Sequence, residues 1–119
     1  MPSRRMKTYS AESGFVYQYY FLESKVKSRF WARGGTAFLF HVTSDRKNFF
    51  VSEVLVEDLA VRGWEKRHSR ALAEQERYAA AKMALFRAFD ESTRPEDLLR
   101  VRVDEANIES LLEPLSLDE

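Results

Sequence analysis

Residues 48–68, NFFVSEVLVEDLAVRGWEKRH, decide the fold class, because the spacing of their apolar side chains changes along the stretch. Residues 48–56 are rich in aromatic and β-branched residues and are typical of a strand. From Asp58 onward, Ala60, Trp64 and His68 recur at helical spacing, and Asp58 is a residue type that caps helices. The stretch therefore predicts a strand followed directly by a helix.

Two further strands are predicted before this stretch. Residues 14–22, GFVYQYYFL, and residues 36–42, TAFLFHV, have the same aromatic and β-branched composition. Ser44, Asp45 and Asn48 supply turn chemistry between the second and third strands. Because this connection is short, we expect these two strands to form a hairpin.

The segment after the first helix predicts a second, central helix over residues 73–91, with a break near residues 69–72. Strong helix formers dominate it, and its apolar residues make a wide stripe. One side of the stripe carries Tyr78, Leu85 and Phe89, and the adjoining side carries Ala79, Met83 and Phe86. We expect Met83 and Phe86 to be buried against the sheet.

The C-terminal residues predict a turn, a strand and a short helix. Pro95 lies in the turn at residues 92–96, and residues 99–103 alternate apolar and basic side chains like a half-buried strand. Asp104 is a cap candidate, and Pro114 cannot continue the helix that follows. Its apolar stripe is Ile108, Leu111 and Leu112. The prediction is an α+β fold in the order βββααβα, a four-stranded, mainly antiparallel sheet with helices packed on one face.

Length and composition predict a single domain. The chain has 119 residues, 45% of them hydrophobic and 32% charged, which is the ordinary globular range. Residues 1–119 are expected to form this one domain, with residues 1–8 flexible. The absence of cysteine excludes disulfides and thiolate metal sites. No apolar run is typical of a secretory signal or of a membrane span, so we expect a cytoplasmic protein without membrane contact.

The formal net charge of zero hides an asymmetry. Residues 1–33 carry seven Lys/Arg and two Asp/Glu, residues 34–89 nine and seven, and residues 90–119 three and ten, for net charges of +5, +2 and −7. A basic beginning and an acidic end can attract each other within a chain or between copies. Solvated charge without a specific role is the alternative interpretation.

Two stretches, SGFVYQYYF at residues 13–21 and ERYAAAKMALFRAFDE at residues 76–91, resemble segments of small uncharacterised bacterial proteins of unknown function. The resemblance implies a bacterial source. It implies no activity, and no functional residue follows from it.

The sequence predicts no catalytic, cofactor or metal site. Histidine is the commonest general acid or base, and the chain has two, His41 and His68. Neither lies in a recognisable catalytic or zinc-binding pattern. Ser44 and Asp45 are sequence neighbours on a turn and do not form a nucleophile motif with His41. An enzyme or a small-molecule binder with a site near His41 is the least favoured hypothesis.

A basic, aromatic segment from Lys25 to Arg33 is the strongest local signal. Basic groups interleaved with large aromatics can neutralise phosphates while the rings stack on bases. The isoelectric point of about 6.8 argues against a nucleic-acid binder, and no RNA-binding motif is present. Nucleic-acid binding through this segment is therefore the alternative hypothesis. The segment's basic and aromatic residues are Lys25, Lys27, Arg29, Phe30, Trp31 and Arg33.

The strands predict self-association, because both of their faces are apolar. Phe15 and Phe21 share one face of the first strand, while Val16 and Leu22 share the other. The helices can cover one face of the sheet, and the last helix is too short to cover the whole of the second. The best hypothesis is a non-enzymatic protein-interaction module that acts as a homodimer or with a protein partner. The expected interaction surface is Tyr17, Tyr19, Tyr20, Lys25, Lys27, Arg29, Phe30, Trp31 and Arg33.

Overall fold

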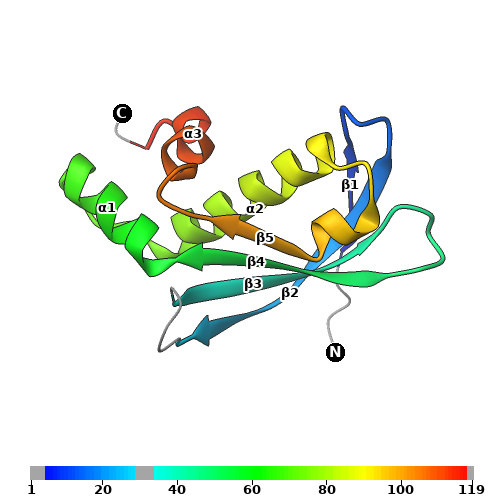
Figure 1. The fold of residues 1–119 in the computed structure, drawn as a ribbon, viewed down its shortest axis with the longest axis horizontal. Coiled ribbons are helices and arrows are strands. Elements are labelled where there is room, and N and C mark those ends of the chain that lie inside the picture. Colours follow the sequence, from blue (N-terminus) through cyan, green and yellow to red (C-terminus); the bar gives the residue numbers. More distant parts are fainter. Residues whose placement is uncertain (1–4, 29–33, 118–119) are drawn as a thin grey trace.

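Aromatic and β-branched runs form most of one curled, five-stranded sheet in the computed structural model, which describes residues 5–28 and 34–117 (Figure 1). Residues 1–4, 29–33, 118 and 119 lie outside the described part. The strands are β1 Lys7–Ser10, β2 Val16–Lys27, β3 Gly35–Thr43, β4 Phe50–Glu57 and β5 Arg100–Val103.

Three α-helices lie on one side of the sheet (Figure 1). They are α1 Asp58–His68, α2 Glu74–Glu91 and α3 Ile108–Leu112, with short 3₁₀ turns η1 Pro95–Leu98 and η2 Glu113–Leu115. The predicted break between the first two helices is confirmed. Ser69, at the end of α1, has a left-handed backbone (φ 54°), which ends the helix. The element order is therefore ββββααβα, with the 3₁₀ turns added.

The strands follow one another across the sheet in the order β1-β2-β3-β4-β5. The first three pairs of neighbouring strands are antiparallel. The last pair, β4 and β5, is parallel, and α1 and α2 form the connection between these two strands. The predicted hairpin of β3 and β4 is confirmed, with Phe40 opposite Ser52. In its loop, Asp45 accepts hydrogen bonds from the backbone N–H groups of Lys47 and Asn48.

The prediction of four strands is wrong, because residues 7–10 form a fifth strand instead of part of a flexible end. One aromatic residue in this polar stretch anchors it. The Tyr9 ring stacks on Phe86 at 4.5 Å between centroids, and its hydroxyl donates a hydrogen bond of 2.8 Å to Asp90. These contacts join residues nearly eighty positions apart, so no local pattern could reveal them.

The core lies between the sheet and α2. Alternate residues of the strands point toward the helix, among them Phe40, Val42 and Val54, all of which are fully buried. From α2, Leu85 and Phe89 pack against them. The Phe89 ring stacks on Tyr17 with 4.1 Å between centroids. Aromatic stacking thus joins the central helix to β1 and β2.

Met83 and Phe86 were expected to be buried and are only half-buried. The fully covered side of α2 is made of Ala80, Ala81, Ala84, Leu85 and Phe89. Three alanines on this side let the helix axis approach the strands closely. That approach turns Met83 and Phe86 to the flank of the helix, where Phe86 meets Tyr9.

The predicted caps are only partly correct. Asp58 is the first residue of α1, and Glu57 precedes it without a side-chain cap. Asp104 lies before α3 and accepts hydrogen bonds from the N–H groups of Ala106 and Asn107. The last apolar stripe is confirmed, since Ile108, Leu111 and Leu112 are all buried.

One glycine is required where β3 begins beside the end of β4. A Cβ added at Gly35 would lie 2.1 Å from the carbonyl oxygen of Val56. A larger residue would therefore push the two strands apart at the point where β4 leads into α1.

Candidate interaction surface

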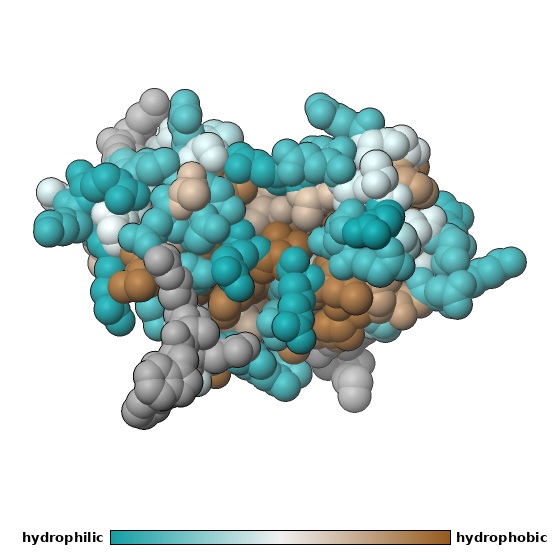
Figure 2. Space-filling model, viewed as in Figure 1, coloured by the Kyte–Doolittle hydropathy of each residue, from teal (hydrophilic) through white to brown (hydrophobic). Residues whose placement is uncertain are grey.

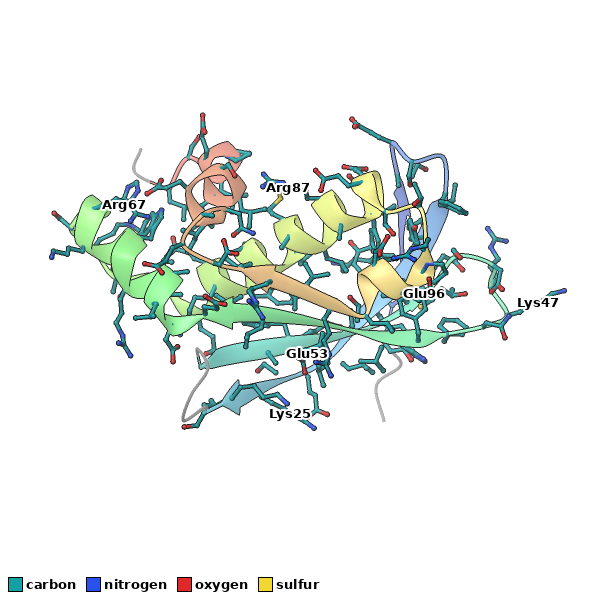
Figure 3. The ribbon with its side chains drawn as sticks, in the orientation of Figure 1. Lys25, Lys47, Glu53, Arg67, Arg87 and Glu96 are labelled. Carbon is teal, nitrogen blue, oxygen red and sulfur yellow. The ribbon has the colours of Figure 1, made fainter. Side chains whose placement is uncertain are left out.

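The sheet has one face that the helices leave uncovered, which we call the open face. The helix α3 packs on α1 and α2, on the covered side, so it does not supply a second cover. Figure 3 shows the labelled Lys25 and Glu53 on the side of the sheet away from α2. On the open face, the paired strands β2, β3, β4 and β5 display side chains together.

An aromatic group occupies one end of the open face. The Tyr20 hydroxyl and the His41 Nδ1 atom are hydrogen-bonded across β2 and β3. The Phe49 ring lies 4.7 Å from the His41 ring. The neighbouring Val51, opposite His41 in the register, is 46% exposed. Figure 2 shows apolar atoms gathered in the middle of the view, over the region of β4 and β5.

The other end of the open face is charged. Lys27 Nζ lies 3.6 Å from Glu53 Oε1. Lys25 Nζ lies 4.0 Å from Glu23 Oε2. Ion pairs of this exposure contribute little to stability, but they make this half of the face hydrophilic. The expected apolar residues Leu39 and Leu55 therefore share this half of the face with charged side chains.

A β-bulge separates the two halves of β2. Phe21 lies opposite Phe40, and Glu23 lies opposite Leu39, so Leu22 is the extra residue. Before the bulge, Tyr17, Tyr19 and Phe21 face the helices. After the bulge, the strand continues to Lys27, past the end of β1, and projects away from the helical layer (Figure 1).

The outer side of this second half of β2 has no strand beside it within the described residues. β1 pairs only with residues 16–19 of β2, ending at the pair Lys7 and Tyr19. We call residues 20–27 the β2 edge. Val26, near its end, is 83% exposed, the most exposed large apolar side chain of those described. An exposed edge of this length is a template for pairing with another strand.

The predicted interaction residues divide into three groups. Tyr17 and Tyr19 are buried under α2, so their assignment to the surface is wrong. Burial raises the pKa of both hydroxyl groups, which fits a place in the core. Tyr20, Lys25 and Lys27 lie on the open face, along the β2 edge. The remaining four, Arg29, Phe30, Trp31 and Arg33, lie outside the described residues.

The predicted strand over residues 14–22 ends too early, because residues 23–27 continue β2. The strand persists because β3 pairs along its whole length, with Lys25 opposite Ala37 and Lys27 opposite Gly35. Pairing with a buried neighbouring strand outweighs the weak β-propensity of Glu and Lys.

Among the residues that the structure describes, neither histidine lies in a recognisable catalytic arrangement. His41 contacts Tyr20 and Phe49 on the open face. His68, at the end of α1, stacks on Trp64 at 4.0 Å between centroids. Its Nε2 atom lies 2.9 Å from Glu109 Oε1, a carboxylate partner that the sequence did not reveal. Among the described residues, no three His, Asp or Glu side chains form a group that could hold a metal ion.

Glu109 is held by two basic neighbours, and this arrangement is structural. Burial by itself would raise the pKa of the Glu109 carboxyl group. The hydrogen bonds and positive charges of Arg67 and His68 outweigh this effect, so the pKa is lowered. Arg67 Nε donates a hydrogen bond of 2.8 Å to the carboxylate. The group therefore ties α1 to α3 as an ion-paired contact.

Two hollows lie outside the aromatic group. One, of about 430 Å³, is lined by Glu57, Arg102, Asp104, Glu105 and Ala106 and is polar. In it, Arg102 Nε lies 3.2 Å from the buried carboxylate of Glu57. The other, of about 60 Å³, is apolar and has room for little more than a small side chain. His41 lines neither hollow, so neither supports the hypothesis of an enzyme site there.

Within the described residues, no helix is long and apolar enough to cross a membrane. Comparison of the chain with protein-family models, curated proteins and solved structures gives no match. The resemblance to small bacterial proteins therefore stays a prediction.

Proposed function

We propose that this protein is a non-enzymatic interaction module that works as a homodimer. The observation that carries the proposal is the exposed sheet surface, which consists of the open face and the β2 edge. A sheet with one covered face and a free edge has two unsatisfied elements, apolar side chains on the face and backbone groups on the edge. A second copy of the chain offers an apolar face and a strand edge of the same kind, and it is present wherever the protein is in solution.

The alternative, nucleic-acid binding through Lys25–Arg33, receives less support. Lys25 and Lys27 each lie beside a carboxylate of the same chain. A phosphate would have to compete with Glu23 and Glu53 for these two cations. In a homodimer, a basic group that leaves the carboxylate of its own chain can meet a carboxylate of the other copy.

Sedimentation equilibrium over a range of protein concentrations tests the proposal. We expect the mass to rise from that of the 13.9 kDa chain toward twice that value as concentration increases. A single species at the chain mass throughout would refute the homodimer. A gel shift with single-stranded RNA at physiological salt is the companion measurement, and a salt-dependent shift would favour the nucleic-acid alternative instead.

A further inference from the structure

The β2 edge has a sequence that is complementary to itself when two copies run antiparallel. Residues 22–26 read Leu, Glu, Ser, Lys and Val, so an acidic and a basic residue flank the central Ser24. Glu23 and Lys25 both point to the open face, since they lie opposite Leu39 and Ala37 on alternate positions of β3. Ser24 and Val26 point to the other face.

Backbone geometry restricts how two such edges can meet. Along a strand edge, only alternate residues direct their N–H and C=O groups outward. Two identical antiparallel edges can therefore bond only if residues of the same parity lie opposite each other. The two-fold axis that relates the two copies must then pass through the position of a residue, which lies opposite the same residue of the other copy. Each possible register is therefore named by the residue at its axis.

Charge distinguishes among these registers. An axis beside Ser24 places Glu23 of each copy opposite Lys25 of the other, twice, with both side chains on the same face. An axis beside Lys25 would place this lysine opposite itself, and an axis beside Glu23 would do the same for the glutamate. An axis beside Val26 would bring Lys25 opposite Lys27. Among these registers, only the one beside Ser24 places both Glu23 and Lys25 opposite an unlike charge.

We propose that two copies of the chain join along the β2 edge, antiparallel and with the axis beside Ser24, to form one continuous ten-stranded sheet. This inference rests on the proposed homodimer and specifies its partner surface. The bulge at Leu22 ends the regular pairing. The exposed Val26 side chain then lies opposite Leu22 of the other copy, which gives this end of the contact an apolar pair.

The geometry has a consequence for the open face. The axis of an antiparallel pair is perpendicular to the sheet, so both open faces point to the same side and both helical layers to the other. Tyr20 and the aromatic group of each copy then belong to one surface of double width. Lysines on a free edge usually discourage strand pairing. Here Lys25 discourages the registers that place it opposite itself or opposite Lys27, and it favours the one that places it opposite Glu23.

Charge exchange tests the register. Lys25→Glu leaves two acids facing two acids in the homodimer, and Glu23→Lys leaves two bases facing two bases. Each single variant is expected to weaken dimerisation about tenfold. Mixing the two variants restores both opposite-charge pairs, and so does the double variant Glu23→Lys/Lys25→Glu. An axis beside Lys25 predicts no rescue by the double variant, which would then place two acids opposite each other at position 25 and a base at position 23 opposite Lys27.

Matched controls are available on the far parts of the surface. Lys47→Glu, at the tip of the β3–β4 loop, and Glu96→Lys, on η1, make the same charge changes away from the edge (Figure 3). Both are expected to dimerise like the unaltered chain. Circular dichroism of each variant checks that the fold is retained.

The measurement is sedimentation equilibrium of each variant and of the mixture, with native mass spectrometry to identify mixed dimers. An interface of five residues from each chain is at the weak end of the size range, so concentrations from about 1 µM to about 500 µM are appropriate. Weakened single variants with rescue in the mixture support the inference. A dimer that the edge variants leave unchanged, or that neither rescue restores, overturns the inference and leaves the homodimer standing. A monomeric unaltered chain overturns both.

Discussion

The two faces of this sheet are built from the same strands and differ in what they expose. On the covered face, Phe40, Val42 and Val54 are fully buried under α2. On the open face, the partly exposed residues of the same strands include His41, Val51 and Glu53 beside the apolar Leu39 and Leu55. Strands with large apolar residues on both sides therefore still have a preferred inner face. The face that carries the charges is the one that remains uncovered.

The largest expected difference between the faces is in stability. Phe89→Ala removes a fully buried ring that stacks on Tyr17, and we expect a loss of about 3–5 kcal/mol in the free energy of unfolding. Phe49→Ala, on the open face, is the matched control and should cost less than about 1 kcal/mol. Urea melts of both variants measure this. Similar losses at the two positions would contradict the assignment of the covered face.

A smaller effect is expected at the flank of the covered face, where Tyr9 holds β1. Tyr9→Phe removes the hydrogen bond to Asp90 and should cost about 1–3 kcal/mol, because the acceptor is a carboxylate. Urea melts at neutral pH measure the loss, and retained near-ultraviolet circular dichroism would show that the ring still packs on Phe86. A loss near zero would mean that stacking alone holds β1.

The same residue predicts a pH dependence. Burial, followed by the bond to Asp90, raises the pKa of Tyr9 from 10.0 to about 12. A raised pKa in the folded state means that the neutral hydroxyl stabilises the fold. This stabilisation is complete below pH 10 and is lost as pH rises toward about 12. Stability should fall over this window less steeply in Tyr9→Phe than in the unaltered chain, and equal slopes would contradict the assignment.

The smallest effect is expected at the charged end of the open face. Lys27→Ala removes the ion pair with Glu53, and since both side chains are about one-third exposed the change should stay within about 0.5 kcal/mol. Denaturant melts at low and high salt measure it. A loss above about 1 kcal/mol would show that this end of the open face contributes to the fold as the covered face does.

The main elements could be predicted because their signals are local. The change of spacing near Asp58, the apolar stripe of residues 73–91 and the alternation around Val101 each lie within one segment. β1 could not be predicted, because Tyr9 finds its partners on α2, far along the chain. The prediction that Met83 and Phe86 form the buried side of α2 is wrong for a related reason. A wide apolar stripe does not reveal which part of it meets the sheet, and the small alanines decided this.

The interaction surface shows the same division. Among the residues expected at the interaction surface, Tyr20, Lys25 and Lys27 lie on the open face, whereas Tyr17 and Tyr19 point into the core. The sequence could not separate these two groups. The bulge at Leu22 has no clear sequence signal. It arises where β2 must stay paired with β3 while the sheet curls.

The sequence by itself determined the α+β class, the hairpin, the three helices and the self-complementary charges around Ser24. All of these depend on residues within a few positions of one another. Only the tertiary structure decided which sheet face is covered, that β1 begins at Lys7 and pairs with β2 no further than Tyr19, and that residues 20–27 form an exposed edge. Those features depend on contacts between distant segments, and their energies are settled only when the whole chain packs.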